Sequence, residues 1–240
     1  MLSLPTLPAN LQANLRALHE RITKAARGAG RDPSSVRLLA VSKAFPATAI
    51  AEAARAGQRA FGENYVQEAV DKIDALAGSA YQPLEWHFIG PIQSNKTRAI
   101  AERFDCVQSV DRLKVAERLA DQRPADLPLL NVLLQVNVSG EASKAGVAPD
   151  ELGQLAAAVA RLPRLRLRGL MAIPAPEADV ARQRAAFART RALFQQLRAQ
   201  GLDVDVLSMG MSDDLDSAIT EGSTMVRVGT AIFGARAVKR

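Results

Sequence analysis

The feature that most constrains the fold is a regular alternation of short apolar segments with longer amphipathic ones. Short apolar runs bounded by turn residues are typical of buried strands, and the segments between them have helical periodicity. The expected strands cover residues 38–43, 59–62, 84–90, 106–110, 129–138, 165–171, 204–209 and 224–228. Eight strand–helix units in 240 residues predict an α/β fold, a single-domain (β/α)₈ TIM barrel spanning residues 1–240. A doubly wound open sheet is the alternative, but no Gly-x-Gly-x-x-Gly sequence follows any strand.

An additional amphipathic segment precedes the first strand. Leu11, Leu15, Leu18 and Ile22 share one face of a helix expected over residues 7–29. The barrel is therefore expected to carry an extra N-terminal helix.

Composition limits the compartment and the partners. The chain has one cysteine, Cys106, which fits a reducing compartment, and neither a signal sequence nor a membrane-spanning run is evident. We therefore expect a cytoplasmic protein with no membrane partner. The net charge of +6 comes from arginines spread along helices and strands, without interleaved aromatic residues. This pattern does not favour nucleic acid as the partner.

The first strand ends on a lysine, Lys43. Functional residues of (β/α)₈ barrels lie where the strands end, on the loops that lead into the helices. A neutral lysine amine at such a place can attack a carbonyl group and form a Schiff base. A lysine that only extends its amine to solvent from the strand end explains the residue equally well.

The loops after the last two strands commonly hold phosphate in such barrels. Here they carry Ser212, before a short helix, and the pair Gly229-Thr230. Ser212 could also be an ordinary helix cap, and Gly229 could simply end its strand. Asp213 and Asp214 would repel a phosphate, so both are expected to point away from it. A strand-end lysine together with a phosphate site suits a ligand with an aldehyde and a phosphate, such as pyridoxal 5′-phosphate.

Five segments resemble the YggS/PROSC family of pyridoxal phosphate homeostasis proteins. They are Leu-Ala-Val-Ser-Lys at 39–43, Phe-Gly-Glu-Asn-Tyr-Val-Gln-Glu at 61–68, Trp-His-Phe-Ile-Gly-Pro-Ile-Gln-Ser-Asn-Lys at 86–96, Leu-Ser-Met-Gly-Met-Ser-Asp-Asp at 207–214 and Val-Arg-Val-Gly-Thr-Ala-Ile-Phe-Gly at 226–234. The resemblance covers nearly the whole chain in the family's order. It implies the barrel of the alanine-racemase N-terminal domain, with the cofactor held as a Schiff base.

The resemblance also implies roles for individual residues. Lys43 would form the Schiff base, and the phosphate would be held by Ser212, Gly229 and Thr230. Arg227 would face the pyridine nitrogen, and Asn64 would lie in the cofactor pocket.

Two further residues have weaker assignments: Lys144, in the loop after the fifth strand, and His87, in the third matching segment. Lys144 matches a lysine implicated in the family as a secondary cofactor contact, and it could also be an ordinary loop lysine. His87 is expected to be hydrogen-bonded to the structure.

Arg227 limits the chemistry that such a site could perform. Arginine stays protonated, so it can only donate to the ring nitrogen, which leaves the ring a poorer electron sink. This argues against an aminotransferase. In the resembling racemases a tyrosine from a second domain supplies the other acid/base group, and no such domain is expected here.

The sequence therefore predicts a protein that buffers or delivers pyridoxal phosphate without robust catalysis, with no catalytic residues and no metal. The alternatives are an amino-acid racemase-like enzyme, for which weak residual activity stays open, and a cofactor-free Schiff-base aldolase. The small-molecule partner is pyridoxal phosphate. Transient contact with apo-enzymes that use it is compatible with this role, and we expect a monomer.

Overall fold

The computed structural model describes residues 10–81, 83–139 and 145–235. Its centre is a closed barrel of parallel strands in chain order, in which the first strand pairs with the last. The strands are β1 (Arg37–Val41), β2 (Ala60–Glu63), β3 (Glu85–Phe88), β4 (Cys106–Val110), β5 (Leu130–Gln135), β6 (Leu165–Met171), β7 (Val206–Ser208) and β8 (Met225–Val228). The predicted single-domain (β/α)₈ barrel is confirmed.

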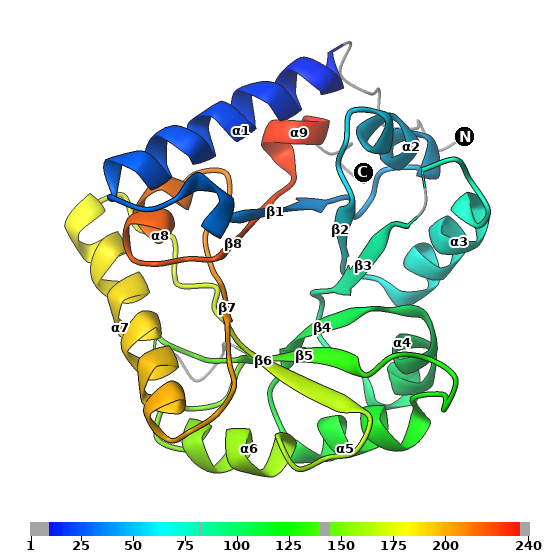
Figure 1. The fold of residues 1–240 in the computed structure, drawn as a ribbon, viewed down its shortest axis with the longest axis vertical. Coiled ribbons are helices and arrows are strands. Elements are labelled where there is room, and N and C mark those ends of the chain that lie inside the picture. The colour runs from blue at the N-terminus through cyan, green and yellow to red at the C-terminus, as the bar shows by residue number, and fades with distance from the viewer. Residues whose placement is uncertain (1–9, 82, 140–144, 236–240) are drawn as a thin grey trace, which may run out of the picture.

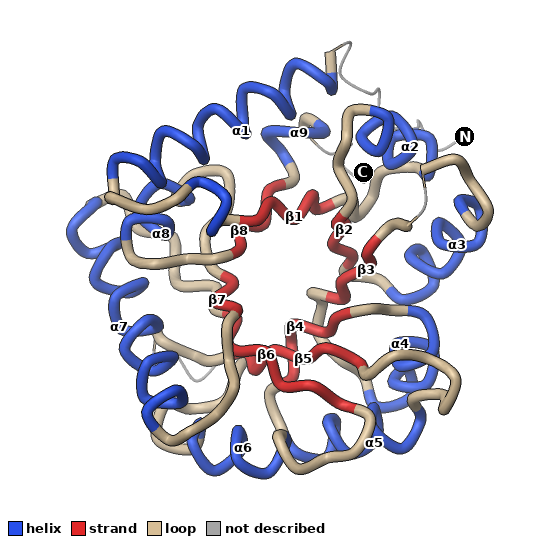
Figure 2. The backbone as a smooth tube through the Cα atoms, in the orientation of Figure 1, coloured by secondary structure: helices blue, strands red, loops and turns tan. Residues whose placement is uncertain are grey.

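Each strand leads into a helix, and the helices form a ring around the strands (Figure 2). They are α2 (Ala47–Arg55), α3 (Val66–Leu76), α4 (Thr97–Arg103), α5 (Leu113–Gln122), α6 (Leu152–Val159), α7 (Val180–Ala199), α8 (Leu215–Thr220) and α9 (Thr230–Phe233). Apolar residues on the outward faces of the strands, such as Phe61 and Val226, pack under this ring in one continuous core. The alternation of strands and helices in the sequence follows from this two-layer packing.

The additional helix α1 (Leu11–Gly28) lies outside the βα pattern and runs along α8 and α9 (Figure 1). Asn10 caps its first turn by accepting a hydrogen bond from the Ala13 amide. Leu11, Leu15 and Ile22 are buried on its inner face, as the periodicity predicts. None of the helices in the described ranges is both long and apolar enough to cross a membrane.

The inside of the barrel contains both apolar and polar side chains. Leu39, Ala60 and Met225 form one apolar cluster, contributed by β1, β2 and β8. Since side chains alternate across a strand, residues two positions further along point the same way. On β1 this places Val41 and then Lys43 on the inner side, toward the carboxyl-terminal mouth. On β8 it places Arg227 there.

Candidate functional site

A cavity of about 470 Å³ lies at the mouth where the strands end. Its lining comprises Val41, Lys43, Asn64, Ile89, Ile173, Met211, Ser212, Asp213, Arg227, Gly229, Thr230 and Ala231. The list contains the six residues predicted to form the main cofactor site, namely Lys43, Asn64, Ser212, Arg227, Gly229 and Thr230. Small-molecule sites usually have volumes of about 300–1,000 Å³, so the cavity is large enough for a ligand of that kind.

Arg227 is the buried cation of the cavity, with 4% of its surface exposed. Its guanidinium donates to Ser208 Oγ at 2.8 Å and to the Ala172 carbonyl at 2.9 Å, and both acceptors are neutral. None of the ion pairs among the described residues includes Arg227. Burial lowers the pKa of Arg227 to about 10, against the opposing charge of Asp214. The guanidinium therefore stays protonated at neutral pH, and an anionic ligand would compensate its charge.

Asn64 follows β2 and is among the residues that line the cavity. Its Oδ1 is buried, and within the described part of the chain it has no hydrogen-bond partner. A buried polar atom without a partner costs free energy, and a ligand with a donor group would remove that cost. Gly90 lies directly beside Asn64: a Cβ at Gly90 would be 2.2 Å from the Asn64 carbonyl oxygen. The close approach of these two loops therefore requires glycine at this position.

The loop after β7 carries Ser212, and its contacts differ from the simple helix cap considered above. Helix α8 begins at Leu215, and the Asp214 carboxylate accepts a hydrogen bond from the Met211 amide at 2.5 Å. Asp213 is among the residues that line the cavity, whereas Asp214 is not. The Ser212 carbonyl accepts from Arg21 of α1 at 2.8 Å, which ties this loop to the extra helix.

The loop after β8 is tied to the same helix. Gly229 comes directly before α9, and a Cβ at this position would lie 3.0 Å from the Val41 carbonyl oxygen of β1. Thr230 is the first residue of α9. Asn14 of α1 donates to the Ile232 carbonyl at 3.0 Å. Helix α1 therefore braces both loops that were predicted to hold phosphate.

His87 lies below the cavity, inside the barrel. It is buried and hydrogen-bonded to Glu85 and Gln108, as was expected for a histidine bound to the structure.

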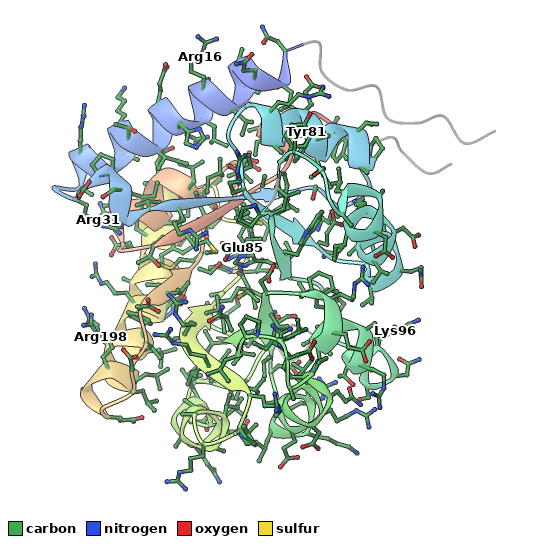
Figure 3. All side chains as sticks on the ribbon, turned by 45° about the vertical axis from the view of Figure 1, so that its right-hand side comes forward. Arg16, Arg31, Tyr81, Glu85, Lys96 and Arg198 are labelled. Atoms are coloured by element: carbon green, nitrogen blue, oxygen red, sulfur yellow. The ribbon has the colours of Figure 1, made fainter. Side chains whose placement is uncertain are left out.

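The positively charged side chains are spread over the surface. Glu85 is near the centre of the barrel in Figure 3, whereas Arg16, Lys96 and Arg198 project from different sides of the outer ring. The positive charge is therefore dispersed, as the sequence suggested. Lys144 lies outside the described residues.

The cavity also has apolar lining residues that the sequence did not single out, namely Ile89, Ile173 and Met211. Ile173 and Met211 are 43% and 39% exposed, so they form part of the rim. Apolar residues just beyond strand ends look like core residues in a sequence, and only the loop geometry assigns them to the lining. A second hollow, of about 510 Å³, is lined by residues of α1 alone. It is the open surface of one helix and brings no residues together from separate elements.

A parallel barrel with a lysine and an arginine at one mouth corresponds to a known class of domain. The family described as "Alanine racemase, N-terminal domain" matches residues 13–237. Alanine racemase from Corynebacterium glutamicum aligns with a TM-score of 0.62 at 22% identity, over 93% of this chain and 62% of that one. At this identity the similarity concerns the fold alone.

Relatives with higher sequence identity than this racemase define the family more narrowly. A pyridoxal phosphate homeostasis protein of Pseudomonas aeruginosa is 62% identical over 228 residues, which are 95% of this chain and 96% of the relative. The corresponding protein of Escherichia coli K12 is 58% identical over 93% of this chain and 95% of its own length. The structure of PipY from Synechococcus elongatus with PLP bound aligns with a TM-score of 0.82 at 39% identity, over 93% of this chain and all of that one. The chain belongs to the family of pyridoxal phosphate homeostasis proteins.

Proposed function

We propose that this chain binds pyridoxal 5′-phosphate as a Schiff base on Lys43 and serves to buffer or deliver it, without robust catalysis. The observation that carries the proposal is the convergence of Lys43, Arg227 and the loops of Ser212 and Thr230 on one cavity. The relatives named above carry the same function in their names, and PipY has a structure with PLP bound.

The residues present fit such a ligand. The buried, protonated guanidinium of Arg227 gives the cavity a fixed positive charge, which suits a ligand that carries a phosphate group. The buried Asn64 Oδ1 atom could accept a hydrogen bond from a donor group of the ligand. Ile89, Ile173 and Met211 supply apolar surface that suits an aromatic ring.

Each part of the site has a separate task in this proposal. Bound pyridoxal phosphate supplies an aldehyde, which condenses with a primary amine, and a ring that withdraws electrons. Ser212, Gly229 and Thr230 would hold the phosphate through hydroxyl and backbone groups. Arg227 would donate to the ring nitrogen and cannot deliver a proton to it, so the ring would remain a poor electron sink.

We propose that catalysis is limited because of which side chains line the cavity. Racemisation needs an acid or base on each face of the substrate carbon. Neither tyrosine of the chain lines the cavity, and Tyr81 accepts a hydrogen bond from Arg55 on the outside of the barrel. His87 is buried in hydrogen bonds below the cavity. The residues that would make a racemase are therefore not assembled around Lys43 in the described part of the chain.

Assembly and location are also part of the proposal. The exposed large apolar side chains include Leu113 of α5, Leu129 just before β5 and Val180 of α7. Their separation along the fold favours a monomer with transient contacts to client apo-enzymes. Cys106 is a buried free thiol, in keeping with a reducing, cytoplasmic setting. We also propose that residues 1–240 form one ligand-binding domain.

The delivery role is tested by loading the purified protein with pyridoxal phosphate, removing the free ligand and adding an apo-enzyme that needs it. We expect the apo-enzyme to regain activity and the chain to lose its bound chromophore. Retention of the ligand with no activation would contradict delivery. Chiral analysis after prolonged incubation with single amino acids tests the racemase alternative, and sustained turnover would contradict the proposal. An aldolase would be colourless and would be trapped by borohydride only with a carbonyl substrate.

A further inference from the structure

A buried ionic cluster lies directly behind the residue proposed to carry the ligand. Glu63, at the end of β2, has a fully buried side chain, and Lys72 of α3 is 6% exposed. The Lys72 ammonium lies 2.8 Å from Glu63 Oε1 and 2.5 Å from Glu68 Oε1. Burial raises the pKa of Glu63, and the ion pair with Lys72 opposes that shift. Charged groups in such a place generally stabilise a fold less than apolar residues of the same size would.

The cluster holds the backbone on both sides of Lys43. On one side, Lys72 Nζ donates to the Ser42 carbonyl at 2.9 Å, and Ser42 Oγ donates to Glu63 Oε1 at 2.7 Å. On the other side, the Ala44 amide donates to Glu68 Oε1 at 2.6 Å. Both peptide groups that flank the Lys43 Cα are therefore linked to one rigid set of charges.

The backbone between these anchors is strained. The Phe45 amide donates to the Ser42 carbonyl at 3.0 Å, which closes a turn with Lys43 and Ala44 at its centre. Ala44 has a φ of 67°, in the left-handed region that penalises any residue with a Cβ. Such a conformation persists only where surrounding contacts enforce it. Here the enforcing contacts include the bond from the Ala44 amide to Glu68.

We propose that Glu63, Lys72 and Glu68 are positioning residues that fix this turn and so direct the Lys43 side chain into the cavity. The inference rests on the proposed function, because it assumes that Lys43 bonds to the aldehyde. The cluster acts on the covalent step alone, since its side chains hold the backbone of Lys43 and are not among the residues that line the cavity.

Glu68 offers the sharpest test, because its side chain is 32% exposed, whereas those of Glu63 and Lys72 are buried. Replacing Glu68 therefore disturbs the packing of the fold least. Glu68→Ala removes the acceptor of the Ala44 amide, and Glu68→Gln keeps an oxygen there. Two ligands separate the steps: pyridoxal phosphate, which can bond to Lys43, and pyridoxine phosphate, which has no aldehyde. The matched control is Glu102→Ala, which removes an exposed helix glutamate that pairs with Arg98 at 3.8 Å.

The rate of Schiff-base formation is followed by stopped-flow absorbance, and the lysine that borohydride labels is mapped by mass spectrometry. We expect Glu68→Ala to slow the covalent step about tenfold, since small misplacements of a reacting group have effects of this size or more. Glu68→Gln and Glu102→Ala should react at the wild-type rate. The affinity for pyridoxine phosphate should stay within about twofold of wild type in every variant, because the ligand contacts are intact.

Other outcomes overturn the inference. An unchanged rate in Glu68→Ala, or an equally slow rate in Glu68→Gln, would show that the Ala44 anchor does not matter. Equal losses for both ligands would indicate general loosening of the fold instead of positioning. Labelling of a different lysine in the wild-type protein would overturn the proposed function together with this inference, and it is distinguished by the peptide map.

Discussion

Gly90→Ala should damage the site, although Gly90 itself is not among the residues that line the cavity. An added Cβ would lie 2.2 Å from the Asn64 carbonyl oxygen and 2.8 Å from the Asn64 Cα. Carbon and oxygen atoms normally stay at least about 3.3 Å apart, so the two loops must separate by about 1 Å. Overpacking of this kind costs about 1–3 kcal/mol, which corresponds to a fall in Tm of about 2–12 °C for a chain of this size. Asn64 would move with its backbone, and loss of its bond to the ligand should raise Kd about five- to tenfold.

Thermal unfolding of the ligand-free protein and calorimetric titration with pyridoxine phosphate measure the two effects separately. Gly28→Ala is the matched control: a Cβ at Gly28, the last residue of α1, meets nothing within 4 Å. Alanine is also the better helix former, so this variant should match wild type or gain up to about 1 kcal/mol. A Gly90→Ala protein with the Tm and the affinity of wild type would refute the packing argument for Asn64.

Three further variants test other parts of the site. Thr230→Val keeps the shape of the side chain and removes its hydroxyl; the affinity for pyridoxine phosphate should fall about tenfold, and that for unphosphorylated pyridoxine should not change. Arg21→Ala removes the hydrogen bond to the Ser212 carbonyl. Calorimetry should show the affinity for pyridoxine phosphate weakened about three- to tenfold and that for pyridoxine unchanged. An equal loss of affinity for the two ligands would contradict the role of Arg21 in holding the phosphate loop. Asn64→Leu removes the buried oxygen that has no hydrogen-bond partner among the described residues, so the ligand-free Tm should stay level or rise while ligand binding weakens. A loss of both Tm and affinity would contradict the role given to that oxygen.

The fold could be predicted from the sequence because the barrel repeats one local pattern of strand and helix. The continuous runs at β1 and β4 reflect burial of both faces of these strands, and the helical periodicity of α1 reflects burial of one face. Boundaries were less accurate where side chains compete for backbone groups. The short helix expected directly after Ser212 begins at Leu215, because Asp214 binds the Met211 amide and shapes the loop before α8.

The strand expected over residues 129–138 also ends earlier, at Gln135. Beyond that point, Val136 forms an isolated parallel bridge with Val147. A run of apolar residues does not show where a strand loses its neighbour and pairs with a loop instead.

The candidate ligand-binding residues were accessible to sequence reasoning for a related reason. In a closed parallel barrel the strand ends meet at one mouth, so Lys43 and Thr230 must be near each other once the fold is known. The Glu63–Lys72 cluster was not accessible in this way. A lysine on an amphipathic helix normally faces solvent, and only the packing of α3 on β2 shows that Lys72 is buried.

The central claim is that the Lys43 amine forms the covalent bond to the ligand. The most direct measurement is to load the protein with pyridoxal phosphate, reduce it with borohydride and locate the modified lysine by mass spectrometry. Wild type and the exposed-lysine control Lys96→Ala should carry the adduct on the peptide that contains Lys43, and Lys43→Ala should lose both the adduct and the bound chromophore. An undiminished adduct in Lys43→Ala, or labelling of another lysine in wild type, would contradict the account.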